Sequence, residues 1–441
     1  MRYQRAMTTP PELYRAKLRT AAEAVAMIPD GAFVVQGNAV GEPPALLAAV
    51  AVRARAGGLT RLTMTSLLPL AASAGSILAA DLHGIIEWRS IFASGGDRKV
   101  VAAGDATYMP AYFHQVPRLY REFLKIDVAL IHVSRVDAHG YMSLGVGVDT
   151  SRAAIESADL VLAQVNDRMP RVHGDAWVHV SEVDAIVEQS SPLTELPVPP
   201  VRPEDAAMGR LIAGMIPDGA TLQLGIGGVP SAVARALMGH KDLGIHTEMF
   251  VDAMVDLVEA GVATGRRKTL HPGKAVFAFA AGSRRMYEFL DDNPGVEGHP
   301  VSYTNAPAII ARNDGLVSVN STIEIDLTGQ CCSESIGPMQ WSGTGGQHDF
   351  ARGAFDSPGG KSIIAFYSTA KNGAVSRVVP TLRPGAVVTT PRTEVHWVVS
   401  EHGAACLKGK STAERARALI GLADPKFRDQ LTAEARRLRH L

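Results

Sequence analysis

The chain has 441 residues, of which 46% are hydrophobic and 20% charged, enough for two or three domains with sizeable cores. Lys+Arg and Asp+Glu both number 44, so we expect neither nucleic acid nor an anionic membrane as a partner. The longest apolar run, 67–80, contains Pro69 and is shorter than the roughly 20 residues of a membrane span, and residues 1–20 do not form a signal peptide. We therefore expect a soluble, cytoplasmic protein. Three cysteines without CxxC spacing favour reduced cysteines in an intracellular protein and do not suggest zinc.

The chain contains an internal repeat. The sequence MIPDG occurs at 27–31 and again, 188 residues later, at 215–219. Each copy follows an Ala-rich helical pattern and precedes a short β-type run and a turn with glycine and proline. Two more matching pairs follow in the same order: 137–140 with 326–329, and 180–182 with 399–401. This order indicates a duplication, and the proline-rich stretch 190–202 between the copies has the composition of a linker.

Short apolar runs alternate with helical patterns in both halves, which predicts an α/β fold with a largely parallel sheet. The runs include 128–133, 160–162, 362–367 and 386–388. We therefore expect two related open α/β domains, residues 1–200 and 201–441. In the tail, Ser411 and Glu414 have the spacing of a capping box that opens one helix, and a second helix follows Pro425.

Two glycine-rich stretches are candidate ligand loops. Residues 223–230, QLGIGGVP, have the pattern of strand, turn and helix, with Pro230 expected at the first helical position. An anion would face the N-terminus of that helix, although a tight turn without a ligand is an equal alternative. Residues 342–347, SGTGGQ, form the second stretch. Its backbone amides can make an oxyanion hole, and here too a plain turn is the alternative.

One carboxylate, Glu248, stands in the stretch LGIHTEMF at 243–250. The apolar spacing predicts a helix from Thr247, as N-cap, to Gly261, with Glu248 in its first turn. That turn follows the carboxyl end of a strand, where open α/β sheets bind their ligands. The alternative to a catalytic role is that Glu248 only complements the dipole of the helix. Residues 243–250 taken by themselves favour this alternative.

The repeat makes Glu248 distinctive. Aligning the copies places Thr65 and Ser66 where the second copy has Thr247 and Glu248. One half then has a carboxylate where the other has a hydroxyl, which suggests one catalytic and one supporting domain. The neighbouring His246 is more often a structural residue than a base in such a position.

The chain resembles the acetyl-CoA hydrolase/transferase family, the class I CoA-transferases, over nearly its whole length. Six motifs carry the resemblance: GIGGVP (225–230), HKDLGIHTEMF (240–250), KTLHPGK (268–274), VNSTIEIDLTGQ (319–330), ESIG (334–337) and SGTGGQHDFARGA (342–354). It implies two related domains of the CoA-transferase type and transfer of CoA between an acyl-CoA and a short acid such as acetate, butyrate or 4-hydroxybutyrate. It also implies no permanently bound cofactor and a homodimer or larger homo-oligomer.

The resemblance assigns roles to individual residues. Glu248 would be the nucleophile that forms a glutamyl-CoA thioester in a ping-pong reaction, with Gly346 at the oxyanion and Asn305 as an active-site amide. Apart from the resemblance, the cations Lys268, Lys274, Lys371 and Arg266 are candidates for contacts with CoA phosphates, although most exposed cations are simply solvated. The implied CoA-binding residues are Gln223, Leu224, Gly225, Ile226, Gly227, Ser342, Gly346 and Lys371, and the candidates for the acyl pocket are Asn38, Val40, Met109 and Tyr112.

Two other functions stay open at this point. Water in place of an acceptor acid would make the protein an acyl-CoA hydrolase that uses the same Glu248. A non-catalytic binding protein on the same scaffold is the second alternative. The sequence does not specify the acyl donor or the acceptor.

Overall fold

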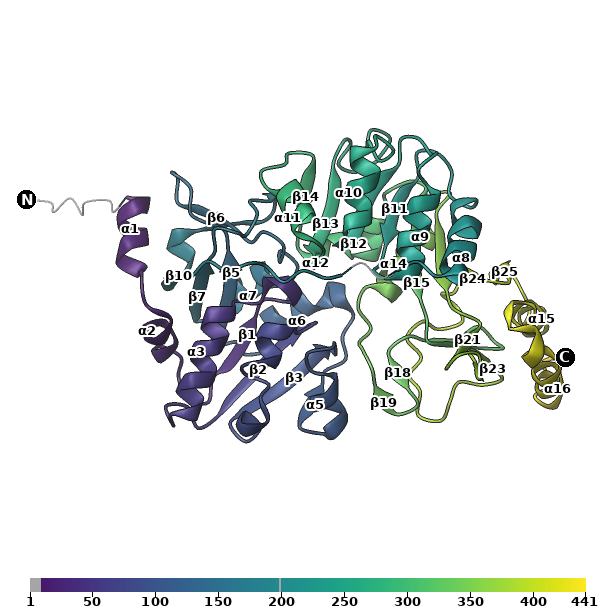
Figure 1. Ribbon diagram of the computed structural model, residues 1–441, viewed down its shortest axis with the longest axis horizontal. Coiled ribbons are helices and arrows are strands. Elements are labelled where there is room, and N and C mark those ends of the chain that lie inside the picture. Colours follow the sequence, from purple (N-terminus) through teal and green to yellow (C-terminus); the bar gives the residue numbers. More distant parts are fainter. Residues whose placement is uncertain (1–8, 198–199) are drawn as a thin grey trace, which may run out of the picture. The chain divides into compact units, whose positions relative to one another are not determined.

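The computed structural model describes residues 9–197 and 200–441 (Figure 1). They form two compact units. Of the described residues, the first comprises 9–109, Val116–Glu195 and Tyr287–Pro300, and the second comprises Pro110–Gln115, 196–197, 200–286 and Val301–Leu441. The main change from one unit to the other falls within the proline-rich stretch. Two short segments, 110–115 and 287–300, each belong to a different unit from the residues that flank them in the chain, and no sequence motif predicts this.

The first unit is built on a parallel sheet of seven strands in the order β10-β7-β5-β1-β2-β3-β4. Strands β2 and β5 are buried at every position, as expected for a parallel sheet with both faces covered. The strands are β1 Phe33–Gln36, β2 Leu62–Leu67, β3 Ile86–Phe92, β4 Ala106–Tyr108, β5 Val128–Val133, β7 Leu160–Val165 and β10 Ala185–Glu188. The helices are α1 Pro10–Lys17, α2 Ala21–Ala26, α3 Pro44–Arg55, α4 Ala71–Ala74, α5 Arg98–Ala103, α6 Val116–Glu122 and α7 Ser151–Ser157.

The second unit has a sheet with the order β25-β24-β20-β15-β11-β12-β13, in which only β25 is antiparallel to its neighbour. Its strands are β11 Thr221–Leu224, β12 Gly244–Phe250, β13 Ala275–Ala280, β15 Leu316–Ser321, β20 Lys361–Ala365, β24 Trp397–Ser400 and β25 Gly403–Cys406. Its main helices are α8 Pro203–Ala213, α9 Gly228–Ala236, α10 Asp252–Glu259, α12 Val301–Thr304, α13 Pro307–Ile310, α14 Gln347–Asp356, α15 Thr412–Leu422 and α16 Arg428–Arg437. Helix α11 spans Arg284–Leu290.

The order of the strands confirms the duplication. Strands β24-β20-β15-β11-β12-β13 of the second unit follow the same order as β10-β7-β5-β1-β2-β3 of the first. The equivalence also shows that one matching pair was wrong. Residues 180–182 form a short 3-10 helix before β10, whereas Val399 and Ser400 end β24. Their three-residue identity is therefore accidental.

Strand pairing also corrects the alignment around the carboxylate. The first residues of β1 and β11 are equivalent in the repeat, and they pair with Thr63 and Gly244, respectively. Thr63 of β2 is therefore equivalent to Gly244 of β12. Four residues further along each strand, Leu67 and not Ser66 is equivalent to Glu248. The sequence alignment missed this by one residue because it cannot see the register of the sheet. The first unit thus has an apolar side chain at the position of the carboxylate.

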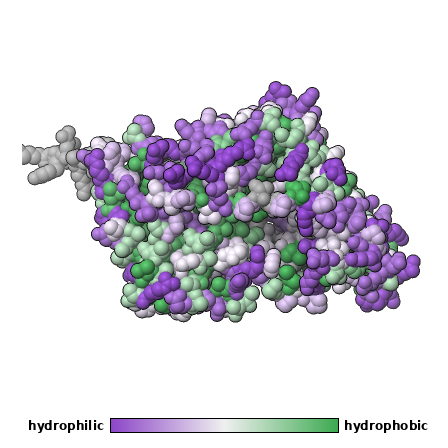
Figure 2. Space-filling view, viewed as in Figure 1, coloured by the Kyte–Doolittle hydropathy of each residue, from purple (hydrophilic) through white to green (hydrophobic). Residues whose placement is uncertain are grey.

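Several local predictions have clear outcomes. Ser411 opens α15, where its hydroxyl accepts a hydrogen bond from the amide of Glu414, and α16 follows Pro425 as expected. The outer faces of these last helices are hydrophilic (Figure 2). The run 386–388 is not a strand, since Val387 and Val388 are each 41% exposed. No helix of the described residues is long and apolar enough to cross a membrane.

A buried carboxyl in the first unit leads to a prediction about stability. Glu42 is 4% exposed and accepts a hydrogen bond from the amide of Leu70 at 2.7 Å. Burial raises the pKa of Glu42 to about 7, from an ordinary value of 4.5. A carboxyl with a raised pKa binds its proton more tightly in the folded state than in the unfolded state. Its contribution to the free energy of unfolding is therefore fully present below pH 4.5 and is lost as the pH rises to about 7.

Glu42→Gln removes this ionisation and keeps an oxygen acceptor. We expect the free energy of unfolding to rise by about 3 kcal/mol at pH 8 and to change little near pH 4.5. Chemical denaturation at both pH values measures the difference, with Glu204→Gln on the exposed surface of α8 as the control. An equal effect at the two pH values would show that ionisation of Glu42 is not the cause.

Candidate active site

Glu248 lies in strand β12 and not in a helix. The predicted helix from Thr247 is wrong at its start, because the strand pairs with β13 as far as Phe250 and α10 begins only at Asp252. Every residue of β13 is buried, and its ladder of hydrogen bonds outweighs the helical spacing of the sequence. The explanation of Glu248 as a charge in the first turn of a helix is therefore excluded.

Three of the predicted residues meet at one point of the second unit. The side-chain amide of Asn305, just after α12, donates a hydrogen bond to Oε2 of Glu248 at 2.6 Å. Gly346 is the N-cap of α14. A Cβ added at Gly346 would lie 1.8 Å from Oε2 of Glu248 and 2.3 Å from Nδ2 of Asn305. A residue with any side chain cannot occupy position 346 without moving the carboxylate or the amide.

The surroundings hold this group in place. Asn305 is fully buried, while Glu248 is half-buried and remains accessible. His246, on the same strand as Glu248, donates from Nε2 to the carbonyl of Thr304 at 2.8 Å. This bond ties β12 to the end of α12, directly before Asn305. His246 is structural, as expected.

A residue that the sequence reasoning missed organises the loop before Gly346. Glu334 is 3% exposed, and its carboxylate accepts hydrogen bonds from Gln340 at 3.2 Å and Thr389 at 3.0 Å. Its backbone carbonyl accepts the amides of Trp341 and Ser342. The loop that leads to Gly346 is thus fixed on Glu334. The motif ESIG marked this segment, but its spacing gave no role to the glutamate.

Ser342 and Lys371 are not brought to this group. The hydroxyl of Ser342 donates to the carbonyl of Ser333 at 3.2 Å, which fixes the loop. Lys371 is exposed in the turn between β21 (Thr369–Ala370) and β22 (Val375–Ser376). We find no contact from Lys371 to Glu248 or Asn305 among the hydrogen bonds and ion pairs of the described residues.

The glycine loop after β11 borders a cavity of about 810 Å³ in the second unit. Four predicted CoA-binding residues line it: Leu224, Gly225, Ile226 and Gly227. The fifth, Gln223, is buried and accepts a hydrogen bond from Asn320 at 3.0 Å. Pro230 is the third residue of α9 and not the first, because the helix begins at Gly228. Gly227 has a φ of 117°, which only glycine adopts without strain.

The basic residues near β12 are already engaged. Lys268 is 4% exposed and donates to the carbonyls of Ile245 and Lys274 at 2.8 and 2.7 Å. Its ammonium group serves the backbone, so its assignment as a phosphate ligand is wrong. Arg266 forms an ion pair with Asp242 on the surface, at 2.6 Å.

Two candidates for the acyl pocket, Asn38 and Tyr112, belong to different units. Asn38 is buried in the first unit, where its amide donates to Thr150 at 2.8 Å, so its role there is structural. Tyr112 belongs to the second unit and stacks on His348, with ring centroids 4.8 Å apart. His348 follows Gly346 by two residues. Tyr112, at 38% exposure, therefore lies beside α14, the helix that follows Gly346.

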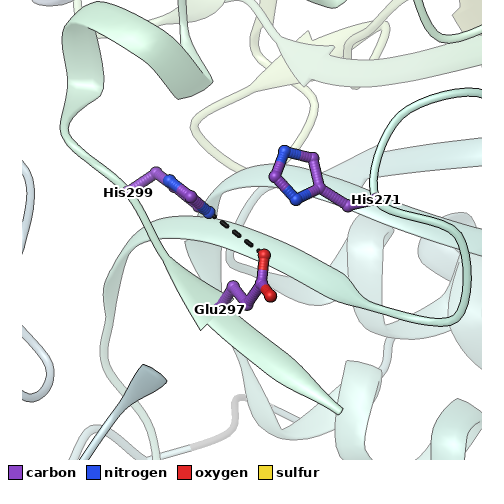
Figure 3. Close-up of side chains that lie close together, drawn as sticks. All are labelled: His271, Glu297 and His299. Carbon is purple, nitrogen blue, oxygen red and sulfur yellow. Dashed lines mark hydrogen bonds and ion pairs between the residues drawn. The ribbon is translucent and has the colours of Figure 1, made fainter. Parts of the chain in front are cut away.

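Two further pairs of polar side chains are in contact. In the first unit, Nε2 of His299 and Oε2 of Glu297 are 3.2 Å apart (Figure 3). In the second unit, Nε2 of His271 and the hydroxyl of Tyr303 are 2.7 Å apart.

Comparison with known proteins fits this geometry. The model of the acetyl-CoA hydrolase/transferase N-terminal domain matches residues 2–199, and that of the C-terminal domain matches residues 282–435. The chain belongs to the acetyl-CoA hydrolase/transferase family. It is an enzyme of the CoA-transferase type.

Individual members of the acetyl-CoA hydrolase/transferase family align over almost the whole chain. The 4-hydroxybutyrate coenzyme A transferase of Clostridium kluyveri is 48% identical over 425 residues, 96% of this chain and 98% of that protein. The butyryl-CoA:acetate CoA-transferase of Anaerostipes caccae is 40% identical, over 96% and 97%. The crystal structure of RipA from Yersinia pestis superposes with a TM-score of 0.95 at 45% identity, over 98% of this chain and 100% of that one.

The hydrogen bond from Asn305 leads to a prediction about pH. Asn305→Asp would place a second carboxylate against Glu248, and a like charge at this distance raises the pKa of its neighbour. We expect a tenfold or greater loss of transfer at pH 7, about 1.4 kcal/mol or more, and a rate that rises with pH beyond the plateau of the wild type. Asn305→Ala is the control, since it loses the bond but adds no charge and should keep the pH profile of the wild type.

Steady-state rates from pH 5 to 9 measure both variants. Identical pH profiles for the two would refute an electrostatic contact between residue 305 and the nucleophile.

Proposed function

We propose that this protein transfers coenzyme A between an acyl-CoA and a short carboxylic acid, through a covalent intermediate on Glu248. The observation that carries the proposal is the carboxylate of Glu248 held by Asn305 at 2.6 Å against the backbone of Gly346. Nucleophilic acyl transfer needs a carboxylate held in position and a backbone N–H that can stabilise an oxyanion, and these three residues supply both. The second unit supplies all three groups, and the first unit is the supporting domain.

The first half-reaction is attack on the thioester. An oxygen of Glu248 adds to the thioester carbonyl, and the amide N–H of Gly346 stabilises the resulting oxyanion. We find no hydrogen-bond partner for this N–H within the described part of the chain. The carbon–sulfur bond then breaks, which leaves a mixed anhydride between Glu248 and the acyl group, together with the thiolate of CoA.

The second step moves CoA onto the protein. The thiolate attacks the carbonyl carbon of Glu248 in the anhydride, the bond to the acyl carboxylate breaks, and the donor acid leaves as an anion. A glutamyl-CoA thioester remains. An acceptor carboxylate then reverses the two steps. The acceptor enters as a carboxylate and the donor acid leaves as a carboxylate, so no net proton transfer is required. The reaction therefore needs no general base in addition to Glu248.

The substrates follow from the relatives. The names of the two similar transferases specify 4-hydroxybutyrate, butyrate and acetate. We propose acids of this size for this chain, with acetate as one partner. Hydrolysis of the thioester by water is the second candidate, because the family name includes hydrolases and the half-buried Glu248 leaves room for water to reach the intermediate.

One measurement separates the two functions. Purified protein is given butyryl-CoA with and without acetate, and acetyl-CoA and free CoA are both quantified. Transfer predicts acetyl-CoA formation that depends on acetate, with little free CoA. Rapid release of CoA without any acid would refute the transferase and establish the hydrolase.

A further inference from the structure

A short segment of the second unit, residues 110–115, packs among the elements that carry the reacting groups. The chain on both sides of this segment belongs to the first unit. Its last residues form the 3-10 helix η3, Phe113–Gln115, which packs against α12, the helix that directly precedes Asn305. None of its residues takes part in the chemistry proposed for Glu248, so its role must lie in the structure of the site.

The segment also reaches the strand beside the nucleophile. Phe113 is 2% exposed, and its ring centroid lies 6.1 Å from that of Phe279 in an edge-to-face arrangement. Phe279 belongs to β13 and pairs with Met249, the residue that follows Glu248 in β12. Movement of Phe113 would therefore displace the strand that pairs with β12 next to the nucleophile.

A carboxylate–imidazole pair joins the segment to α14. Asp349, in the first turn of α14, is fully buried, and both of its oxygens accept hydrogen bonds from His114. The backbone N–H of His114 donates to Oδ2 at 3.2 Å, and the ring donates from Nδ1 to Oδ1 at 2.7 Å. A carboxylate only accepts, so Nδ1 carries the proton. Because a buried carboxylate is costly without such partners, these bonds hold the segment and α14 together.

The turn of α14 that contains Asp349 begins at the proposed oxyanion donor. Gly346 is the N-cap of α14, three residues before Asp349. The first N–H groups of a helix have no partner within the helix, and the positive end of its dipole lies there. A residue that fixes this turn therefore fixes the direction of the N–H of Gly346. Tyr112 adds a second contact with the same turn through its stack on His348.

We propose that His114 and Asp349 are positioning residues for CoA transfer, an inference that rests on the proposed function of Glu248. Through this pair the segment 110–115 holds α12, β13 and α14 at fixed distances and so aligns the three reacting groups with one another. A displacement of about 1 Å in such an arrangement can lower the rate by about 10²-fold. The effect belongs to kcat and not to KM, because the alignment matters most in the transition state.

The test compares two substitutions at residue 114. His114→Ala removes the ring donor, and we expect kcat for transfer from butyryl-CoA to acetate to fall about 10- to 100-fold, with KM within about twofold of the wild type. His114→Asn keeps a side-chain N–H that can take the place of Nδ1 and donate to Asp349. This variant should recover kcat to within about threefold of the wild type. A role in folding alone would leave kcat of the folded protein unchanged in both.

Asp349→Asn breaks the same contact from the side of α14. It keeps the buried volume but turns one acceptor into a donor, and we expect kcat to fall about tenfold with KM unchanged. This variant supplies the measurement if His114→Ala does not fold. His83→Ala, which removes an imidazole 3.3 Å from Asp105 in the first unit, is the matched control and should keep both kcat and KM. Circular dichroism checks the fold of each protein.

A double-mutant cycle shows whether the pair acts through the oxyanion donor. Gly346→Ala is combined with His114→Ala, or with Asp349→Asn where His114→Ala does not fold, and kcat is measured for all four proteins. Where Gly346→Ala has already displaced the donor or the carboxylate, the second substitution should cost less than about threefold.

Each outcome decides one of the two proposals. An undiminished kcat in a folded variant of the pair, a loss confined to KM, or losses that multiply in the cycle would overturn the positioning role. A His114→Asn protein as slow as His114→Ala would overturn it as well, since the hydrogen bond would then not be the cause. A wild-type protein that transfers no CoA from any acyl-CoA would instead overturn the proposed function.

Discussion

Glu248→Ala is expected to lower kcat/KM for CoA transfer by about four orders of magnitude or more, because it removes the atom that forms the covalent bond. Glu248→Gln should be equally inactive, since a neutral amide keeps the shape and the contact with Asn305 but is not a nucleophile. Both proteins should fold, because the side chain of Glu248 is only half-buried. Steady-state rates and circular dichroism measure the two expectations.

The covalent intermediate gives a second, independent measurement. Incubation of the wild type with butyryl-CoA, without an acceptor, should add the mass of CoA to one peptide that contains Glu248. Glu204→Ala, at an exposed glutamate of α8, is the matched control and should keep both the adduct and the rate. An adduct on another residue, or measurable turnover by Glu248→Gln, would refute the assignment.

Much of this arrangement could be predicted from the sequence because it is repeated or local. The copies of MIPDG each lead into the equivalent strands β1 and β11, so the duplication could be found without coordinates. The capping box at Ser411 depends on four consecutive residues and was predicted correctly. The convergence of Glu248, Asn305 and Gly346 depended instead on the family motifs.

Errors arose where pairing between distant segments decides the structure. The residues after Thr247 have helical spacing, but the buried ladder to β13 keeps them extended as far as Phe250. Val387 and Val388 form an apolar run, yet no strand of the described residues pairs with them and they stay exposed. Local periodicity cannot reveal which partner a segment will find.

The hydrogen-bond partners of individual side chains could not be predicted from the sequence either. Lys268 was a candidate for a phosphate, but its ammonium group is used by two backbone carbonyls. Glu334 received no role, although it fixes the loop before Gly346. In both cases the contacts come from segments that no motif connects, so only the folded chain reveals them.

Gly346→Ala is expected to reduce kcat by about 10²- to 10³-fold, comparable with the loss of an oxyanion donor. The added Cβ would lie 1.8 Å from Oε2 of Glu248, so the carboxylate, or the loop that carries residue 346, must move away. Left-handed backbone strain is not the cause, because the φ of Gly346 is −93°, outside the region that favours glycine. Gly239→Ala, with no atom within 4 Å of the new Cβ, is the matched control and should keep full activity.

The same clash predicts a coupling that can be measured by stability alone. Gly346→Ala in the wild-type background should lower the free energy of unfolding by about 1–3 kcal/mol, the usual cost of an overpacked site. In a Glu248→Ala background most of that cost should vanish, since the carboxylate that the Cβ meets is gone and only Asn305 still lies close. Denaturant unfolding of the four proteins gives the coupling energy. Additive effects would show that Gly346 and Glu248 are not in contact, and the lost activity of Gly346→Ala would then need another cause.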